Sequence, residues 1–224
     1  TQHKMTPRRP QKRTGERRSS AVKAERGAGV RILSVSDIVV PELVGASSPV
    51  ETNSIDLILG CGDLPPEYLA GLKATYDVPL YYVLGNHDIR HEQVPHGCLN
   101  ISGRIVTHGD FSFLGFSGSR WYNGNPNQYR EREMRAQIRK LWFPLWRLNG
   151  LDVLVTHAPP RHVHDAEDRC HRGFSCYRDF IRKYRPRFLI HGHIHRVFET
   201  PAERLSVVNE TKVLNSYGYH IFEI

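Results

Sequence analysis

Five short apolar segments of this sequence each end in residue types that bind metal ions. The polar groups that follow them are Ser36-Asp37, Gly60–Asp63, Gly85–Asp88, Thr156–Pro160 and His191–His195. Side chains at the carboxyl ends of neighbouring strands converge at one edge of an α/β sheet. Asp, Asn and His supply oxygen and imidazole nitrogen without thiolate, a set that suits Mn, Fe, Zn or a similar divalent ion. The pattern therefore predicts a metal site assembled from several strands.

A site of this kind predicts chemistry at phosphorus. A pair of divalent ions can clamp a phosphate and lower the pKa of a bound water, whose hydroxide then attacks phosphorus in line. A single Asp after a strand is usually a cap or turn residue, and a single His is usually structural. The recurrence of all five groups in order favours a functional site over that interpretation.

The apolar segments themselves predict buried strands, because short apolar runs that end in turn residues are typical of such strands. They are Val30–Val35, Ile55–Leu59, Val78–Leu84, Leu151–Val155 and Phe188–Ile190. Helices are expected at Pro66–Tyr76, Gln128–Leu148 and Phe174–Lys183. Pro144 should kink or end the second helix, since proline cannot donate a backbone hydrogen bond.

Alternating segments predict antiparallel strands added to this frame. Gly103–His108 and Phe111–Phe116 are expected to form a hairpin that turns at Gly109-Asp110. Val197–Thr200 is expected to form strands with Val213–Asn215 and Tyr219–Ile224. The predicted fold class is α/β, with parallel strands and added hairpins.

Positive charge is concentrated at the amino end of the 224-residue chain. Residues 1–30 carry nine Lys or Arg and two Glu, which accounts for +7 of the net charge of +8. Residues 1–29 lack the apolar content needed to offset ordering entropy, so we expect a disordered basic tail before a domain at 30–224. The tail is interpreted as a solubilising extension. An anionic partner such as nucleic acid and an organellar transit peptide are the alternatives.

Compartment and membrane contact are also predicted from composition. The sequence has no apolar run approaching the roughly 18 residues of a membrane span, so no membrane partner is expected. The amino end shows no apolar region of a secretory signal, and the four cysteines match no common zinc spacing. A cytoplasmic protein with free thiols is the expectation.

The ordered motifs resemble the calcineurin-like metallophosphoesterase family, whose pattern runs D-x-H, G-D-x-x-D, G-N-H-D/E, a lone His and G-H-x-H. The resemblance spans roughly residues 30–224, and Gly85–Asp88 and Gly192–His195 are its most specific parts. It implies a sandwich of two β-sheets flanked by helices, with metals at the strand ends. It also implies a metal-dependent hydrolase of phosphomonoesters or phosphodiesters.

The resemblance assigns two metal sites. Asp63 would bridge both ions. One ion would also have Asn86, His157 and His193, and the other would have Asp37 and His195. His87 would lie near the leaving oxygen as electrostatic stabiliser or general acid, a task suited to imidazole. Mn²⁺ or Fe is expected first, with Zn²⁺ as the alternative.

Two positions depart from the family pattern. Val39 stands where the family has a metal-binding His, and because valine cannot coordinate, the site with Asp37 and His195 should hold metal more weakly. Pro66 stands where the family has a second Asp that commonly supports the imidazole of the G-N-H motif. Asp88 is then a candidate to orient His87. Losing such supporting groups often costs roughly 10–100-fold in affinity or activity.

The segment after His157 is dense in titratable groups and is expected to be either a solvated loop or a substrate-facing one. Arg161 and Arg172 are candidates to hold a phosphate oxygen, because guanidinium permits bidentate contact. His164, Asp165 and His171 are candidates to replace the missing ligand at the weakened site. The stretch Trp121–Tyr129, rich in Asn, Gly and aromatic residues, could cap the entrance.

Three functions remain open from sequence. The leading prediction is a metal-dependent phosphoesterase. The alternative is a catalytically weak or inactive scaffold of the same fold that binds a protein partner. A nuclease or nucleic-acid-bound phosphoesterase that uses the basic tail is the third. Burying six polar groups without a metal would be costly, which favours the enzyme.

Overall fold

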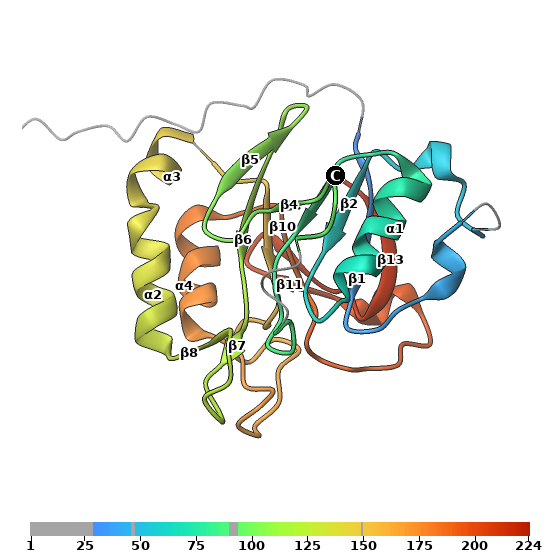
Figure 1. The fold of residues 1–224 in the computed structure, drawn as a ribbon. Coiled ribbons are helices and arrows are strands. Elements are labelled where there is room, and N and C mark those ends of the chain that lie inside the picture. The colour runs from blue at the N-terminus through green and yellow to red at the C-terminus, as the bar shows by residue number, and fades with distance from the viewer. Residues whose placement is uncertain (1–28, 46–47, 90–93, 149) are drawn as a thin grey trace, which may run out of the picture.

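Two β-sheets pack against each other at the centre of the structure, and helices cover their outer faces (Figure 1). The computed structural model describes residues 29–45, 48–89, 94–148 and 150–224. The predicted α/β class and the two-sheet sandwich flanked by helices are confirmed. The predicted basic tail lies outside the described residues, apart from Gly29.

The first sheet has five strands in the order β13-β1-β2-β3-β4. Strands β1 to β4 are parallel to one another, and β13 is antiparallel to β1. The bounds are β1 (Arg31–Ser36), β2 (Leu57–Gly60), β3 (Leu80–Tyr82), β4 (Leu99–Asn100) and β13 (Gly218–Glu223).

The second sheet has six strands in the order β11-β12-β10-β9-β6-β5. Its four middle strands are parallel, and the outer pairs β11–β12 and β5–β6 are antiparallel. The bounds are β5 (Ile105–His108), β6 (Phe111–Phe116), β9 (Val153–Thr156), β10 (Phe188–His191), β11 (Leu205–Val208) and β12 (Thr211–Asn215). Two short strands, β7 (Ser119–Arg120) and β8 (Gln128–Tyr129), form a separate parallel pair.

Apolar side chains of both sheets meet in one cluster between them, which includes Leu57, Leu59, Phe113 and Val153. Helix α1 (Pro66–Tyr76) covers the outer face of the first sheet. Helices α2 (Glu131–Lys140), α3 (Trp142–Leu148) and α4 (Ser175–Tyr184) cover the second. Short 3-10 helices lie at Pro41–Leu43, Thr52–Ser54 and Pro201–Arg204. Because the parallel strands are covered on both faces, they are apolar almost throughout.

The expected core strands, the hairpin of β5 and β6, and helix α1 are confirmed. The expected long helix is instead two helices that separate at Leu141. Pro144 cannot donate to the carbonyl of Lys140, four residues earlier, and its ring crowds that group, so the first helix ends there as expected. Pro144 itself lies in the first turn of α3, where its missing N–H costs little. The expected strand at Val197–Thr200 is wrong, because β11 at Leu205–Val208 pairs with β12 instead.

Within the described residues, no helix combines the length and the apolarity that crossing a membrane requires. The parallel strands instead bring their carboxyl ends, with the polar groups that follow them, to one edge of the sandwich.

Candidate metal centre

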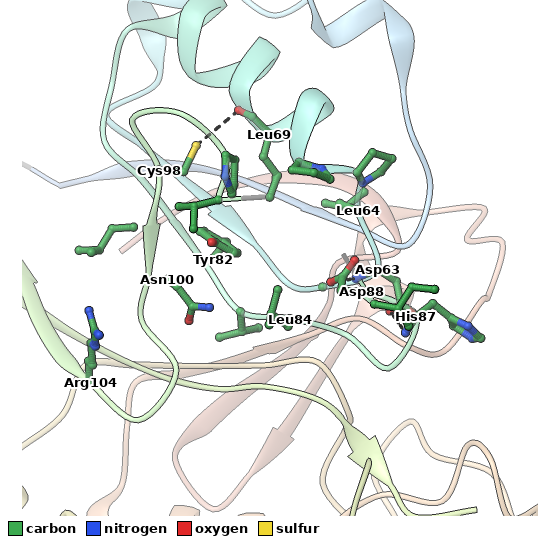
Figure 2. Close-up of a pocket in the computed structure, with 18 residues that line it drawn as sticks. Asp63, Leu64, Leu69, Tyr82, Leu84, His87, Asp88, Cys98, Asn100 and Arg104 are labelled. Carbon is green, nitrogen blue, oxygen red and sulfur yellow. Dashed lines mark hydrogen bonds between the residues drawn. The ribbon is translucent and has the colours of Figure 1, made fainter. Parts of the chain in front are cut away.

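The loops after β2 and β3 are held together by the carboxylate of Asp88. Its Oδ2 atom accepts hydrogen bonds from the backbone amides of Asp63 at 2.9 Å and Gly85 at 2.7 Å. Figure 2 shows the side chains of Asp63 and Asp88 next to each other. Such charge-assisted bonds are roughly twice as strong as neutral ones. Asp88 therefore positions the backbone of Asp63.

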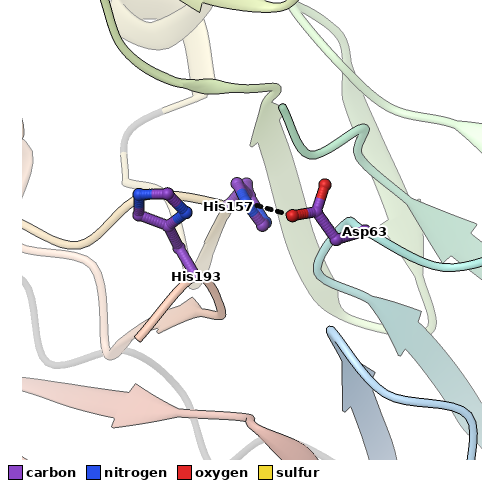
Figure 3. Close-up of side chains that lie close together, drawn as sticks. All are labelled: Asp63, His157 and His193. Atoms are coloured by element: carbon purple, nitrogen blue, oxygen red, sulfur yellow. Dashed lines mark ion pairs between the residues drawn. The ribbon is translucent and has the colours of Figure 1, made fainter. Parts of the chain in front are cut away.

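Asp63, His157 and His193 form the cluster of described residues best suited to a metal ion (Figure 3). One ligand atom of each residue lies within 4.8 Å of the others. Nε2 of His157 lies 3.3 Å from Oδ2 of Asp63, and the two imidazole centroids are 4.8 Å apart. Both histidines are buried. These residues follow β2, β9 and β10, so the cluster draws on both sheets.

The hydrogen bonds of His157 define which nitrogen faces the cluster. Its Nδ1 lies 2.8 Å from the carbonyl oxygen of Cys61, which can only accept, so Nδ1 carries a proton. Its Nε2 lies 3.0 Å from Oδ1 of Asn86, whose amide nitrogen donates to the hydroxyl of Tyr122. A neutral His157 would thus point its Nε2 lone pair at oxygens of both Asp63 and Asn86. A proton or a cation is required at this point, because three facing acceptors repel one another.

The electrostatics of Asp63, His157 and His193 agree with this requirement. Burial alone would raise the pKa of Asp63, but the charge and hydrogen bond of His157 lower it to about 2. Burial alone would lower the pKa of His157, but Asp63 raises it to about 9. Burial and the charge on His157 lower the pKa of His193 to about 3. His193 is therefore neutral at pH 7, the form in which histidine binds metals.

Asp37 and His195 form a second group beside the first. The buried carboxylate of Asp37 accepts hydrogen bonds from the backbone amide of His193, at 3.0 Å to each oxygen, and from the hydroxyl of Ser36. Nε2 of His195 lies 3.3 Å from Oδ1 of Asp37, and this hydrogen bond raises the pKa of His195. The ring of His195 stacks on Tyr217 with centroids 5.0 Å apart. Asp37 and His195 therefore supply one imidazole between them, which agrees with the valine at position 39, where the family pattern has a second histidine.

Three of these residues have left-handed backbones, with φ of 69° at Asp37, 56° at Asp63 and 68° at His193. Such conformations cost of order 1–3 kcal/mol each in a non-glycine residue and cluster at functional sites. Close approach adds a second constraint. A Cβ at Gly85 would overlap the carboxylate of Asp63, and a Cβ at Gly192 would overlap Ser36 and Asp37. Only glycine fits at these positions.

The structure also shows where the two residues that depart from the family pattern lie, together with His87 and Asp88. Val39 is 44% exposed, and Pro66 is the first residue of α1. The side chain of His87 is exposed, while its backbone amide donates to Oδ1 of Asp63 at 2.7 Å. Asp88, expected to orient the ring of His87, is engaged by backbone amides as described above.

Two candidates in the loop after β9, Arg161 and Asp165, bond to each other, and the other candidates bond to different residues. The guanidinium of Arg161 pairs with Asp165 at 2.7 Å and with Glu167 at 2.7 Å, and Asp165 also accepts amides of His162 and Gly173. His164 uses Nδ1 toward His191 and Nε2 toward Ser206, each at 2.8 Å.

The remaining candidates of this loop are Arg172 and His171. Arg172 contacts the backbone oxygen of Glu167 at 2.9 Å and leaves its buried Nε without a hydrogen bond among the described residues. Of the three candidate replacement ligands, His171 has a ring that contacts the metal cluster, with its centroid 5.4 Å from that of His193.

Four groups near the cluster were not expected as contributors. The backbone oxygens of Cys61 and Cys170 accept hydrogen bonds from His157 and His193, each at 2.8 Å. The hydroxyl of Tyr122 holds Asn86, and the amide of Asn127 donates to the backbone oxygens of Gly85 and Asp88 at 3.0 and 3.1 Å. The composition of Trp121–Tyr129 was the available signal for the last two.

This geometry can be compared with known proteins. A family model described as calcineurin-like phosphoesterase matches residues 32–197. The chain belongs to this family. The resemblance inferred from the motifs is thereby confirmed. No curated protein matches the chain.

Solved structures share the fold of this calcineurin-like phosphoesterase at low identity. The protein TT1561 of Thermus thermophilus aligns with a TM-score of 0.60 and 13% identity, over 88% of this chain and 99% of that one. GAP50 of Plasmodium, described as the anchor in the inner membrane complex, aligns with a TM-score of 0.51 and 14% identity, over 84% and 71%.

The residues present fit the divalent ions that this family generally binds. Two imidazoles, a carboxylate and an amide oxygen form a donor set suited to a borderline or hard divalent ion. The Nε2 atom of His157, directed at two oxygens, is the feature of this chain that requires positive charge.

We expect Asp88→Ala to loosen the loops that hold Asp63. The amides of Asp63 and Gly85 lose a charged acceptor, which should lower the free energy of unfolding by about 1.5–3 kcal/mol. Hydrogen exchange at these two amides should rise at least tenfold. Asp88→Asn keeps an acceptor oxygen and serves as the control with a smaller effect. Unchanged exchange in Asp88→Ala would contradict the bracing role.

Proposed function

We propose that this chain hydrolyses phosphate esters with the help of two divalent metal ions. The observation that carries the proposal is the convergence of Asp63, Asn86, His157 and His193, with Nε2 of His157 facing two oxygen atoms. In a buried cluster, such facing acceptors are stabilised by a cation between them. Membership of the calcineurin-like phosphoesterase family supports the same function.

The proposed ligand sets follow the two groups of residues. One ion would have Asn86, His157 and His193, and the other would have Asp37 and His195, with Asp63 shared between them. The 3.3 Å separations of Asp63 from His157 and of Asp37 from His195 support these assignments. Mn²⁺ or Fe suits the nitrogen and oxygen donors first, and Zn²⁺ is the alternative.

The proposed reaction exchanges one P–O bond for another. When bound, the ions supply positive charge against the phosphate oxygens and make water more acidic. The oxygen of water bonds to phosphorus, the bond from phosphorus to the ester oxygen breaks, and a proton passes to the departing alcohol. The exposed ring of His87 is assigned to stabilise or protonate that oxygen, because its backbone is bonded to Asp63.

A second candidate function is a scaffold that binds a protein partner and has little activity. Val39 favours it, because the group of Asp37 and His195 has one imidazole fewer than the family pattern. The likeness of fold to GAP50, described as an anchor, is compatible with it. The buried polar cluster favours the enzyme, since an inactive scaffold has no chemical need for it.

The first test is metal content by elemental mass spectrometry, with hydrolysis of p-nitrophenyl phosphate and bis(p-nitrophenyl) phosphate measured with and without Mn²⁺. We expect bound metal and metal-dependent turnover, and the preferred ester will distinguish monoesters from diesters. Asp63→Asn should reduce both metal content and turnover to background, because the shared carboxylate is lost. Little metal and no turnover in excess Mn²⁺ would favour the scaffold.

His87→Ala should lower kcat by about 10²–10⁴-fold, the usual contribution of general acid–base catalysis, while metal content stays unchanged. His108→Ala is the matched control, because His108 lies at the end of the β5–β6 hairpin remote from the strand ends that hold the metal cluster. Loss of metal in His87→Ala would show that the assigned role is wrong.

Val39→His should raise the amount of metal bound per chain, because it restores an imidazole beside Asp37 and His195. Elemental analysis after dialysis against limiting Mn²⁺ measures the gain, and Val39→Gln controls for polarity at this half-exposed position. An unchanged metal content would mean that another residue already completes the site.

A further inference from the structure

A pocket of about 480 Å³ opens next to the metal cluster, on the side of α1 and β4. Asp63, His87 and Asp88 lie at one end of it, and Arg104 lies at the other (Figure 2). This volume is within the usual range for small-molecule sites. The pocket therefore shares its inner end with the residues to which phosphate chemistry is assigned.

The wall of this pocket is mainly hydrocarbon. Its lining includes Leu64, Pro65, Pro66, Leu69, Leu84, Val94 and Leu99. Two lining residues with ionisable groups are neutral at pH 7. Burial raises the pKa of the Cys98 thiol to about 11, and burial raises the pKa of the Tyr82 hydroxyl. The amide of Asn100 also lines the wall, but it bonds to the Tyr82 hydroxyl and accepts a hydrogen bond from the backbone amide of Ser102. Between its two ends, the wall thus has few polar groups left for a strongly hydrated group.

Pro66, one of the two departures from the family pattern, lies in the wall of this pocket. The family pattern has a carboxylate at this position, and here a proline ring lines the pocket instead. A carboxylate there would place a charge in the wall. The proline both begins helix α1 and keeps the wall apolar.

We propose that this pocket receives the alcohol part of the substrate, and that this part is apolar, such as an alkyl or aryl group. The proposal rests on the proposed phosphoesterase function. With the phosphate at Asp63 and His87, the ester oxygen lies where the pocket begins, so the departing group extends along Leu84 and Leu99 toward Arg104. A sugar or another strongly hydrated alcohol would lose its hydration and gain few partners, because Tyr82 and Asn100 already bond to each other.

The burial of apolar surface determines how strongly the length of an alkyl chain should change its binding affinity. Each methylene buried in such a wall favours binding about fourfold. Affinity should therefore rise with chain length until the pocket is filled, and then level off.

The test uses ethyl-, butyl- and hexylphosphonate, whose C–P bond is not cleaved by phosphoesterases, with isothermal titration calorimetry on the Mn²⁺-loaded full chain. We expect affinity to rise about fourfold per methylene. The kcat/KM values for the matching alkyl phosphates, whose leaving groups have similar reactivity, should rise in parallel.

Matched variants locate the effect. Leu99→Asp should flatten the dependence on chain length, whereas Leu205→Asp should not. These two leucines are 39% and 38% exposed, and both lie in edge strands. Val94→Asp and Val207→Asp form a second pair, 69% and 64% exposed, in case Leu99→Asp does not fold.

The outcomes separate the two proposals. Flat phosphonate affinity, together with hydrolysis of all the esters, overturns the apolar pocket and leaves the phosphoesterase intact. Affinity that rises with length and is sensitive to Leu99→Asp, without any turnover, supports the pocket and overturns the hydrolase. A dependence on length that survives both Leu99→Asp and Val94→Asp places the apolar group elsewhere and overturns this assignment.

Discussion

The hydrogen bond from Nδ1 of His157 to the carbonyl oxygen of Cys61 joins the two sheets at the edge where the candidate ligands meet. Cys61 follows β2 of the first sheet, and His157 follows β9 of the second. The bonds from the amide of His193 to Asp37 repeat the connection one strand further along. Buried polar groups must be satisfied, so the sheets can pack here only in the arrangement that makes these bonds. The geometry of the candidate ligands Asp63, His157 and His193 follows from that arrangement.

This constraint also explains why the cluster needs a proton or a cation between its acceptors. Once the Cys61 carbonyl takes the Nδ1 proton of His157, Nε2 must face Asp63 and Asn86, and Tyr122 turns the Asn86 amide so that its oxygen points inward. The left-handed backbones at this edge add cost, since side chains reach one point only if the chain turns sharply after each strand. The apolar clusters under the helices on both outer faces supply the stability that offsets these terms.

The two departures from the family pattern have different physical consequences. Val39 removes a nitrogen donor at a half-exposed position, which leaves Asp37 and His195 with one imidazole and the cluster of Asp63, His157 and His193 unaltered. Pro66 removes a charge from the beginning of α1, where it becomes part of a mainly apolar wall beside Asp63 and His87. The first change alters the donor atoms of the candidate metal centre, and the second alters the polarity of the neighbouring pocket.

Local signals in the chain were enough to predict the strands, the polar residues at their carboxyl ends and helix α1, because apolar runs and turn residues need no distant partner. The same signals place Asp63, His157 and His193 at strand ends, and the resemblance to the family assigns them as metal ligands. What holds them came from the folded arrangement alone, since Cys61 and His157 are 96 residues apart and meet through sheet packing. The bracing by Asn127 and the apolar pocket belong to the same class. Each depends on how elements pack against one another, and no local period records that packing.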